Sequence, residues 1–413
     1  MRLPDSLTVL RERRFAWFYT ARLVSTLGSM MAPVALAFAA LEVSDSAAAL
    51  GLVLAARTVP MVVFLLFGGV VADRFDRSLV MRVSHVLSAL TQGAVAVLVL
   101  TGVAEVWMLV GLEAVNGTVA AFSFPAMASI VTNLVPRRHL QQANALLSMS
   151  RSGLSILGPT LAALVVAAAG AGWALAFDAL TWLLAAFCLL RVALPPRALE
   201  RATASMVAEL REGWTLFRST TWLWLIVAVF GVLNAIHSGA WFTLGPTLAK
   251  HSFGVGGWGL VLSAESVGTL LMTVVMLRLR LRHPLRAGML ACTVFALPLL
   301  MLGSTTHVPL IALGAFLSGM GMEVFGMGWN LAMQENIEER MLSRAYSYDA
   351  LGSFVAMPVG QVAAGPLADA FGYHRVIVTS AFAYAVLALG TLLSRSVWSM
   401  ERAPAPDPEP VTR

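Results

Sequence analysis

The stretch Gly68-Gly69-Val70-Val71-Ala72-Asp73-Arg74-Phe75-Asp76-Arg77 lies between two long apolar runs, one ending near Phe67 and one beginning at Leu79. Its two glycines leave bare backbone at the end of the first run, so a neighbouring helix can approach closely. Asp73 stands where the apolar run meets water. A carboxylate there can accept hydrogen bonds from the N-terminus of a neighbouring helix, where the helix dipole favours negative charge.

The composition of the chain places it in a lipid bilayer. Of its 413 residues, 58% are hydrophobic and 12% are charged, and the mean hydropathy is +0.79. Soluble domains carry about 25% charged residues and are about half apolar, so a soluble core would not hide this much apolar surface. A net charge of +6 would suggest a nucleic-acid partner in a soluble protein. Here the arginines stand in short loops, where they set membrane orientation, and we expect no nucleic-acid partner.

Membrane-spanning helices need about 20 apolar residues each, and the chain holds about twelve such runs. Their approximate limits are 15–41, 47–72, 79–101, 105–134, 141–169, 173–194, 222–249, 255–278, 286–303, 308–333, 343–370 and 374–395. The sequence therefore predicts an all-α integral membrane protein with twelve transmembrane helices. Because arginines precede the first run and follow the even-numbered runs, we expect both termini in the cytoplasm of a bacterium, with the helices crossing its inner membrane.

The only long polar connection divides these helices into six and six. The predicted parts are a six-helix bundle at 1–194, a linker with an amphipathic helix at 195–221, a second six-helix bundle at 222–396 and a disordered proline-rich tail at 397–413. Gly117 and Gly319 are 202 residues apart, and so are Gly158 and Gly360. A repeat with a fixed offset indicates two parallel halves that face a shared site near the middle of the membrane.

Gly69, Asp73, Arg74 and Arg77 match, position by position, the signature loop glycine-x-x-x-Asp-Arg-x-x-Arg of the major facilitator superfamily. The opening stretch resembles that loop, which joins the second and third helices of the family. The resemblance implies that it acts as a conformational latch between the two halves on the cytoplasmic side. An ordinary charged turn between two spans is the alternative interpretation.

The wider chain resembles the exporter branch of this superfamily, which includes the enterobactin exporter. The resemblance rests on Phe124-Pro125-Ala126, Gly158-Pro159, Trp329 and the stretch from Asp349 to Gly360. It implies proton-driven efflux of small amphiphilic molecules such as drugs, antibiotics, siderophores or other secondary metabolites. Proton-coupled uptake stays open as an alternative. A membrane receptor or scaffold is disfavoured because the chain has no long soluble domain.

The chain departs from the exporter pattern at three places. Gly28-Ser29 replaces a common Gly-Asp pair, Glu113 replaces an arginine found in many drug–proton antiporters, and Thr160-Leu161-Ala162-Ala163 replaces a glycine pair. The direction of transport, the coupling ion and the substrate therefore stay open.

Ionisable residues inside membrane spans are costly and are functional candidates. They are Arg22, Arg57, His85, Glu113, Arg151, Asp178, His237, Glu265, Glu323 and Asp349. In the family architecture, the first helix of each three-helix repeat lines the cavity, and these four helices hold Arg22, Glu113, His237 and Glu323. Because a proton carrier must be buried yet reachable, we expect Glu113 and Glu323 to lead, with Glu265 third.

Depth along the helices, at about 1.5 Å per residue, indicates which charges can pair. Arg22 and Glu323 share one depth near the cytoplasmic end, and Glu113 lies at the depth of Arg57 and Asp178. The alternative to proton carriage is therefore a fixed ion pair of Glu113 with Arg57, or of Glu323 with Arg22.

Other charges are expected to be structural. Arg151 and Glu265 both lie near the middle of helices that touch across the halves in the family fold, and a pair between them would join the halves. Asp178 and Asp349 match recurrent family positions, and we expect them to stabilise the helices. For His85, we expect ordinary packing.

Aromatic residues near the presumed cavity suit amphiphilic cargo, because flat apolar surfaces accept varied shapes. The cavity candidates are Arg22, His237, Phe124, Trp241, Phe325 and Trp329. Ordinary helix packing is the alternative for each aromatic residue, and a hydrogen bond within its helix is the alternative for His237.

Nothing in the sequence indicates an enzyme. Cys188 and Cys292 both lie in apolar runs, which disfavours disulfides and a metal site. We find no nucleotide-binding loop and no nucleophile–base pair. The expected partners are a small-molecule substrate, protons and the lipid bilayer, with no cofactor, and we expect a monomer.

Overall fold

The computed structural model describes residues 9–74, 77–129, 131, 134–136, 139–192, 206–276, 278–279 and 281–401. Within these ranges it describes the backbone alone for 65–74, 77–78, 124–129, 141, 206–210, 339–340 and 343. The helices are α1 (Arg13–Ser44), α2 (Ala47–Arg74), α3 (Arg77–Thr101), α4 (Val106–Ser129), α5 (Leu140–Ala169), α6 (Ala171–Leu190), α7 (Met206–Ser219), α8 (Thr221–His237), η4 (Ser238–Thr243), α9 (Leu244–His251), α10 (Gly254–Met276), α11 (Pro284–Cys292), η5 (Thr293–Phe295), α12 (Ala296–Ser304), α13 (Val308–Asn336), α14 (Glu339–Phe354), α15 (Met357–Phe371), α16 (Tyr373–Gly390), η6 (Thr391–Leu393) and α17 (Arg395–Trp398). The described residues contain no strand.

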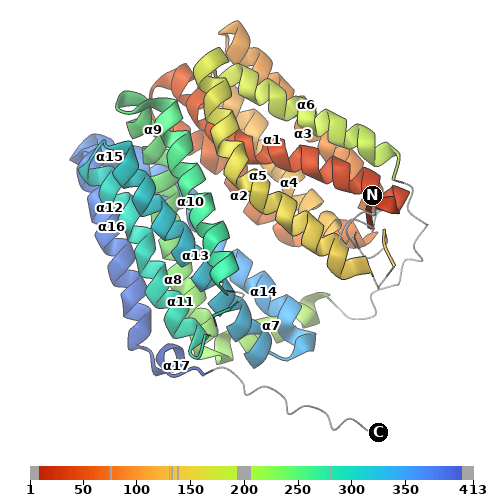
Figure 1. Cartoon of the computed structure of the whole chain (residues 1–413), viewed down its shortest axis with the longest axis vertical. Coiled ribbons are helices and arrows are strands. Elements are labelled where there is room, and N and C mark those ends of the chain that lie inside the picture. Colours follow the sequence, from red (N-terminus) through yellow and green to blue (C-terminus); the bar gives the residue numbers. More distant parts are fainter. Residues whose placement is uncertain are drawn as a thin grey trace.

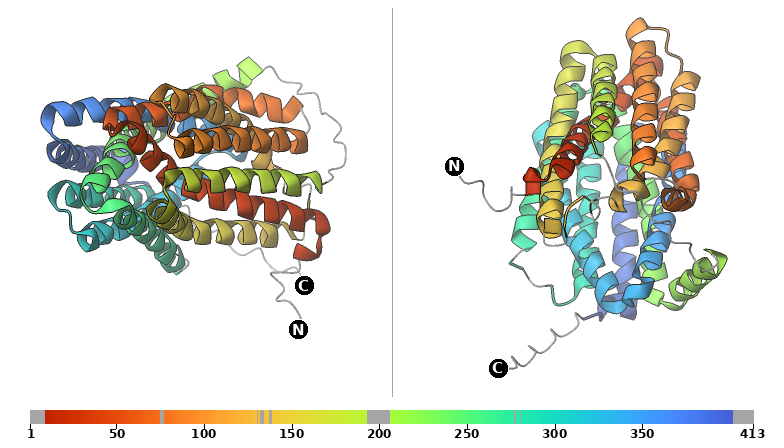
Figure 2. Two further views of the ribbon diagram at one scale, coloured as in Figure 1. Left: turned by 90° about the horizontal axis from the view of Figure 1, so that it is seen from above. Right: turned by 90° about the vertical axis from the view of Figure 1, so that its right-hand side faces the viewer.

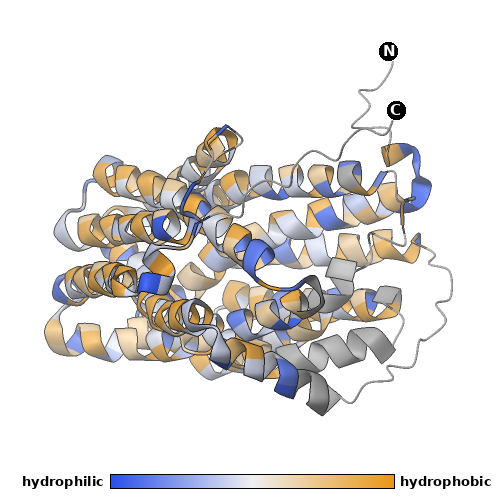
Figure 3. Ribbon diagram, turned by 90° about the horizontal axis from the view of Figure 1, so that it is seen from below, coloured by the Kyte–Doolittle hydropathy of each residue, from blue (hydrophilic) through white to orange (hydrophobic). Residues whose placement is uncertain are grey.

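Within the described residues, twelve helical segments are long and apolar enough to cross a membrane, which confirms the predicted fold class. Eight of them are single helices: α1 to α6, α10 and α13. The other four are composite: α8–η4–α9, α11–η5–α12, α14–α15 and α16–η6. Helices suit this setting because they satisfy their own backbone polar groups in lipid. Hydrophobic residues recur along the helices in Figure 3.

The spans form two groups. Helices α1 to α6 pack on one another, and so do the segments from α8 to α16 (Figure 1). The packing partners match between the groups: α2 lies on α4 as α10 lies on α13, and α3 lies on α6 as α12 lies on α16. We call these groups the first and second halves. Figure 2 shows them from two further directions.

Glycines lie at matched helix crossings in the two halves. A Cβ atom at Gly117 would be 2.0 Å from the carbonyl oxygen of Arg57, and one at Gly319 would be 1.9 Å from that of Glu265. Gly158 likewise packs against Met30, and Gly360 against the carbonyl of Ala235. The glycine repeat read from the sequence therefore corresponds to pairs of close helix contacts.

The halves meet at the end where α1 joins α2, α5 joins α6 and α15 joins α16, which we call the turn end. Gly51 of α2 packs against the carbonyl of Gln361, with a virtual Cβ only 2.0 Å from its oxygen. The matched contact places Gly259 of α10 against Ala163 and the carbonyl of Pro159 on α5. In Figure 1 the two halves converge near α9 and α15 and diverge toward α7 and α14, at what we call the terminal end.

The amphipathic helix expected in the linker is α7, which packs on α14. Glu212 pairs with Arg344, and the rings of Trp214 and Phe217 lie 5.9 and 5.8 Å from that of Tyr348. Residues 195–205 of the linker, the two residues before it and residues 402–413 of the predicted tail lie outside the described residues.

Candidate functional site: a cavity between the halves and a buried charge cluster

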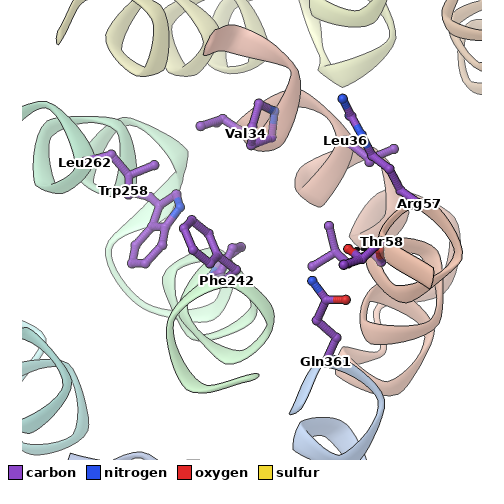
Figure 4. A pocket seen from close by; sticks show the side chains of 11 residues that line it. Val34, Leu36, Arg57, Thr58, Phe242, Trp258, Leu262 and Gln361 are labelled. Atoms are coloured by element: carbon purple, nitrogen blue, oxygen red, sulfur yellow. Dashed lines mark hydrogen bonds between the residues drawn. The ribbon is translucent and has the colours of Figure 1, made fainter. Parts of the chain in front are cut away.

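A cavity of about 210 Å³ lies between the two halves, lined by residues of α1, α2, η4, α9, α10 and α15. Its charged or polar lining comes from Arg57, Thr58 and Gln361, and Phe242 and Trp258 are its aromatic lining residues. Figure 4 shows Arg57 and Thr58 on the first half, with Phe242 and Trp258 across from them. A mostly apolar cavity with a few polar groups is the usual form of a small-molecule site.

The side chain of Arg57 connects this cavity with a buried acid. It is 30% exposed and its Nη1 lies 3.8 Å from Oε2 of Glu113, whose side chain has no exposed surface. Gln92 of α3 donates from Nε2 to Oε1 of Glu113 at 2.9 Å. In the described part of the chain, Oε2 of Glu113 has no hydrogen-bond partner. The similar depths of Arg57 and Glu113 therefore correspond to an ion pair.

Asp178 of α6 completes what we call the charge cluster: Arg57, Gln92, Glu113 and Asp178. It is 1% exposed, and its Oδ1 has no hydrogen-bond partner among the described residues. It lies within electrostatic range of both Arg57 and Glu113. The cluster thus places two carboxyl groups and one cation inside the first half.

Two glycines make room for this cluster. Gly117 lies one helical turn after Glu113 and lets α4 press against the backbone of Arg57, which brings the acid to the guanidinium group. A Cβ atom at Gly28 would lie 2.3 Å from Oδ1 of Asp178. A side chain at either position would push apart helices that the cluster needs close together.

A different set of buried polar groups lies in the second half. The π-helix η4 contains Trp241, whose side chain is fully buried and whose indole N–H has no hydrogen-bond partner in the described chain. The nearby acid is Glu265. The His237 ring stacks 6.2 Å from Trp241 and lies edge-on to Phe242, and its Nδ1 is also unpartnered among the described residues. π-Helices occur frequently at functional sites, and this one carries Phe242 to the cavity.

Two charge pairs suggested by depth are not formed here. Within the described residues, Arg22 makes no ion pair with Glu323, and Arg151 makes none with Glu265. For Arg22 and Glu323 the physical reason is that the halves diverge toward the terminal end, where Arg22 lies nine residues into α1. Glu265 lies beside Trp241 of the second half instead. Arg22 and Arg151 instead lie near each other on the first half. Glu323 is half-buried on α13.

Phe325 and Trp329, which we expected at the cavity, pack inside the second half. Phe325 stacks on Phe230 with ring centroids 4.3 Å apart, and Trp329 meets Trp222 at 5.7 Å. The indole of Trp329 donates to Oδ2 of Asp349 at 3.0 Å. Neither residue lines the cavity, so the structure favours the packing alternative for both.

His85 also packs as expected: its Nδ1 lies 2.7 Å from the carbonyl oxygen of Met81, and its ring meets Trp182 edge-on at 4.9 Å. For Asp349, the bond from Trp329 ties α13 to α14, and Ser353 of the same helix donates to its Oδ1 at 3.1 Å.

A clasp joins the halves at the turn end. Asp45 lies in the left-handed region with φ of 49° and ends α1. Lys250 donates from Nζ to Oδ1 of Asp45 at 2.6 Å and to the carbonyl oxygen of Leu41 at 2.7 Å. Nε2 of His251 lies 3.3 Å from the same Oδ1. The hydrogen bond from Lys250 lowers the pKa of Asp45 below its ordinary value.

The latch residues predicted from the signature loop cannot be placed by their contacts. Gly69, Asp73, Arg74 and Arg77 lie where the structure describes the backbone alone, and so does Phe124. The backbone does place a helix end at Arg74 and a helix start at Arg77.

Sequence reasoning missed three groups that matter for the geometry. Gln92 and Gln361 escaped because only ionisable residues were sought inside the apolar runs, although an amide in a membrane span also needs a partner. Lys250 is the third group, and the signal that could have found it is that it is the single lysine of the chain.

Two helical halves around a shared cavity with a buried charge cluster define a membrane transporter. The chain belongs to the Major Facilitator Superfamily, whose family model matches residues 18–360. It is 26% identical over 403 residues to the multidrug efflux pump Tap of Mycolicibacterium fortuitum, covering 90% of this chain and 93% of Tap. It is 22% identical over 378 residues to the macrolide efflux protein A of Streptococcus pyogenes, covering 89% and 92%. Among solved structures, a mutant of the nucleoside transporter NupG matches with a TM-score of 0.76 at 14% identity, covering 91% of this chain and 99% of NupG.

Proposed function

We propose that this transporter exports small amphiphilic molecules in exchange for protons by alternating access. The observation that carries the proposal is the position of Arg57, whose side chain lines the cavity and pairs with the buried Glu113. Tap and the macrolide efflux protein are named as efflux pumps, which supports export.

Coupling follows from the charge on Arg57. While Glu113 is ionised, it neutralises Arg57 and the cavity wall is close to apolar. A proton on Glu113 removes that ion-pair partner and makes the net charge of the cluster at the wall, which also includes Asp178, more positive by one. Because apolar cargo does not solvate a charge, protonation disfavours cargo binding. Binding of cargo in the cavity and binding of a proton to Glu113 then disfavour each other, which is the requirement for exchange of the two across the membrane.

The proposal includes an orientation. Arginines at the terminal end favour a cytoplasmic location for that end and for both termini, in the bacterial inner membrane. The turn end, where the halves meet, then faces outward, and cargo enters the cavity from the cytoplasm. Residues 1–194 and 222–396 act as two rocking units joined by 195–221, with 397–413 as a tail, and one chain suffices for transport.

A vesicle assay tests coupling and direction together. In inverted vesicles with an acidic lumen, the wild-type protein should concentrate a fluorescent amphiphile such as 1-pyrenebutanol. Glu113→Gln should reduce this pH-driven accumulation to about a tenth or less, because an amide does not exchange a proton. Exchange of labelled for unlabelled amphiphile without a gradient should continue, but only at higher amphiphile concentration, because the neutral amide mimics the protonated state that disfavours cargo.

Glu323→Gln tests the other leading carrier expected from the sequence, an acid inside the membrane that has no ion-pair partner in the described chain, and loss of coupling there would give it a share of the proton transfer. The control is Glu401→Gln, which removes an exposed acid and should stay coupled. Full pH-driven transport by Glu113→Gln would remove that acid as the carrier. Accumulation only under the reversed gradient would make the protein an uptake symporter.

A further inference from the structure

A second cavity, of about 330 Å³, lies on the first half between α1 and α5. It is separate from the cavity between the halves. Arg22 lines the second cavity and Val34 lines the first, and these residues are twelve positions apart on α1, which corresponds to about 18 Å along the helix.

Two unpaired cations line the second cavity. Arg22 of α1 and Arg151 of α5 are close enough to repel each other electrostatically. Neither guanidinium group has an ion-pair or hydrogen-bond partner in the described part of the chain, and no carboxylate stands among the described residues that line the cavity. Charges inside membrane spans almost always pair with another group of the protein or face a water-filled cavity. Arg22 is half-buried and Arg151 is exposed, and two adjacent cations without a partner among the described residues suit an anion that enters the cavity.

The other residues that line the second cavity indicate the chemistry of the rest of the ligand. Phe18, Leu147 and Leu154 give apolar surface, whereas Asn144 and Ser148 offer hydrogen bonds. A guanidinium group binds the two oxygens of a carboxylate, phosphate or sulfonate through parallel N–H bonds. The ligand that fits is an amphiphile with one compact anionic group.

The position of Arg151 places this site on the route of the cargo. One turn further along α5, the carbonyl of Ser155 accepts a 2.8 Å hydrogen bond from Ser266 of α10. Residues four apart share a helix face, so Arg151 lies on the face that meets the second half, just beyond the contacts that join the halves. A ligand held there borders the opening between the halves.

We propose that Arg22 and Arg151 bind the anionic group of the cargo at the terminal end, before its apolar part enters the cavity between the halves. This names an anionic amphiphile as the substrate class and rests on the proposed transport function.

Binding of three matched probes to the purified full chain in nanodiscs, without any gradient, tests the site. The anionic 1-pyrenebutyrate should bind at least about tenfold more tightly than the neutral 1-pyrenebutanol or the cationic 1-pyrenebutylamine. Arg22→Gln and Arg151→Gln should each weaken pyrenebutyrate binding about tenfold and leave pyrenebutanol binding unchanged. Arg395→Gln, an exposed arginine on α17, is the control and should change neither. Because pyrenebutanol reports on folding, a variant that fails to fold would lose both probes.

Other outcomes overturn the proposal. Equal affinity for the three probes, or pyrenebutyrate binding that survives both arginine substitutions, would show that the arginines do not hold cargo. Displacement of pyrenebutyrate by phosphatidylglycerol nanodiscs, without transport of pyrenebutyrate in vesicles, would identify a lipid headgroup site instead. Failure of pH-driven transport for every compound, with the binding pattern intact, would contradict the proposed function and leave this site standing.

Discussion

Asp45 shows how one residue position fixes a contact between the halves. Its left-handed backbone conformation ends α1 and turns its carboxylate toward Lys250 and His251. Tyr373 also lies within electrostatic range of it. Because Asp45 and Lys250 are partly exposed, water screens the pair, and its contribution to stability is small. The clasp therefore suits a contact that must open during each transport cycle.

The lowered pKa of Asp45 gives the clasp a defined pH dependence. A group with a lowered pKa in the closed state contributes stability above its ordinary pKa, and this is lost as the pH falls through the lowered value. In the Glu113→Gln background, where the proton-coupled shift of the halves is removed, we therefore expect the distance between spin labels at Ser44→Cys and Ser252→Cys to stay constant from pH 8 to 5 and to lengthen only below about pH 4. Asp45→Asn should remove this transition. A transition at pH 6 that persists in Asp45→Asn would assign it to another group.

Lys250 also allows a chemical test, because the chain has no other lysine. In Asp45→Asn at pH 8, acylation of the Lys250 amine, followed by mass spectrometry, should be about two- to fivefold faster, as expected for loss of an exposed ion pair. His251→Gln is the comparison that keeps the carboxylate. Equal rates in wild type and Asp45→Asn would mean that the clasp does not hold the amine.

Residue depth could be read from the sequence, but helix rotation and the separation of the halves could not. Their similar depths predicted the pair of Glu113 and Arg57, and this pair forms because the two residues lie on neighbouring helices of one half. The same argument paired Arg22 with Glu323, which lie in different halves, and that pair is not formed among the described residues. A depth match thus predicts a contact only within one packed body.

At the scale of elements, the crossing of α2 and α4 positions the charge cluster. Its close approach depends on Gly117, since a Cβ there would lie 2.0 Å from a backbone oxygen that has no freedom to rotate away. Gly111 on the same helix has nothing within 4 Å of a virtual Cβ. Alanine substitutions at Gly117 and Gly111 can therefore be compared to separate the effect of packing from the helix propensity of alanine.

Gly117→Ala should destabilise the protein by about 1–3 kcal/mol through overpacking and should weaken pH-driven transport, because α4 must move away from Arg57. Gly111→Ala should be neutral or slightly stabilising, because alanine favours the helix. The midpoints of thermal unfolding in detergent and the vesicle assay measure both effects. Identical behaviour of the two variants would contradict the role given to the crossing.

Element positions followed closely from the apolar runs, since about 20 apolar residues in lipid leave the helix as the main choice. The run predicted at 374–395 is the span Tyr373–Leu393, and that at 222–249 is Thr221–His251. The π-helix inside the latter was not predicted. It depends on tertiary bonds such as that from Ser238 Oγ to the carbonyl of Met357, which local sequence does not reveal.

For the whole molecule, the described contacts between the halves gather at the turn end. They are small-residue contacts at Gly51 and Gly259, hydrogen bonds from Ser263 and Ser266 to α5, and the clasp. Small residues and exposed ion pairs let surfaces meet closely and part again without burying large side chains. The repeat was predictable from the glycine offsets. The sequence did not predict at which end the halves meet, because both ends carry residues that allow such a contact.

Alternating access coupled to Glu113 predicts that the two ends move in opposite senses. Spin labels at Ser44→Cys and Ser252→Cys report the turn end, and labels at the exposed Met149→Cys and Val274→Cys report the terminal end. Cys188 and Cys292 are buried and are replaced by serine in both pairs. Lowering the pH from 8 to 5 in nanodiscs should shift the populations of both distances together, lengthening one pair as the other shortens, and Glu113→Gln should abolish the shift. Distances that stay fixed, or that change in the same sense at both ends, would contradict it.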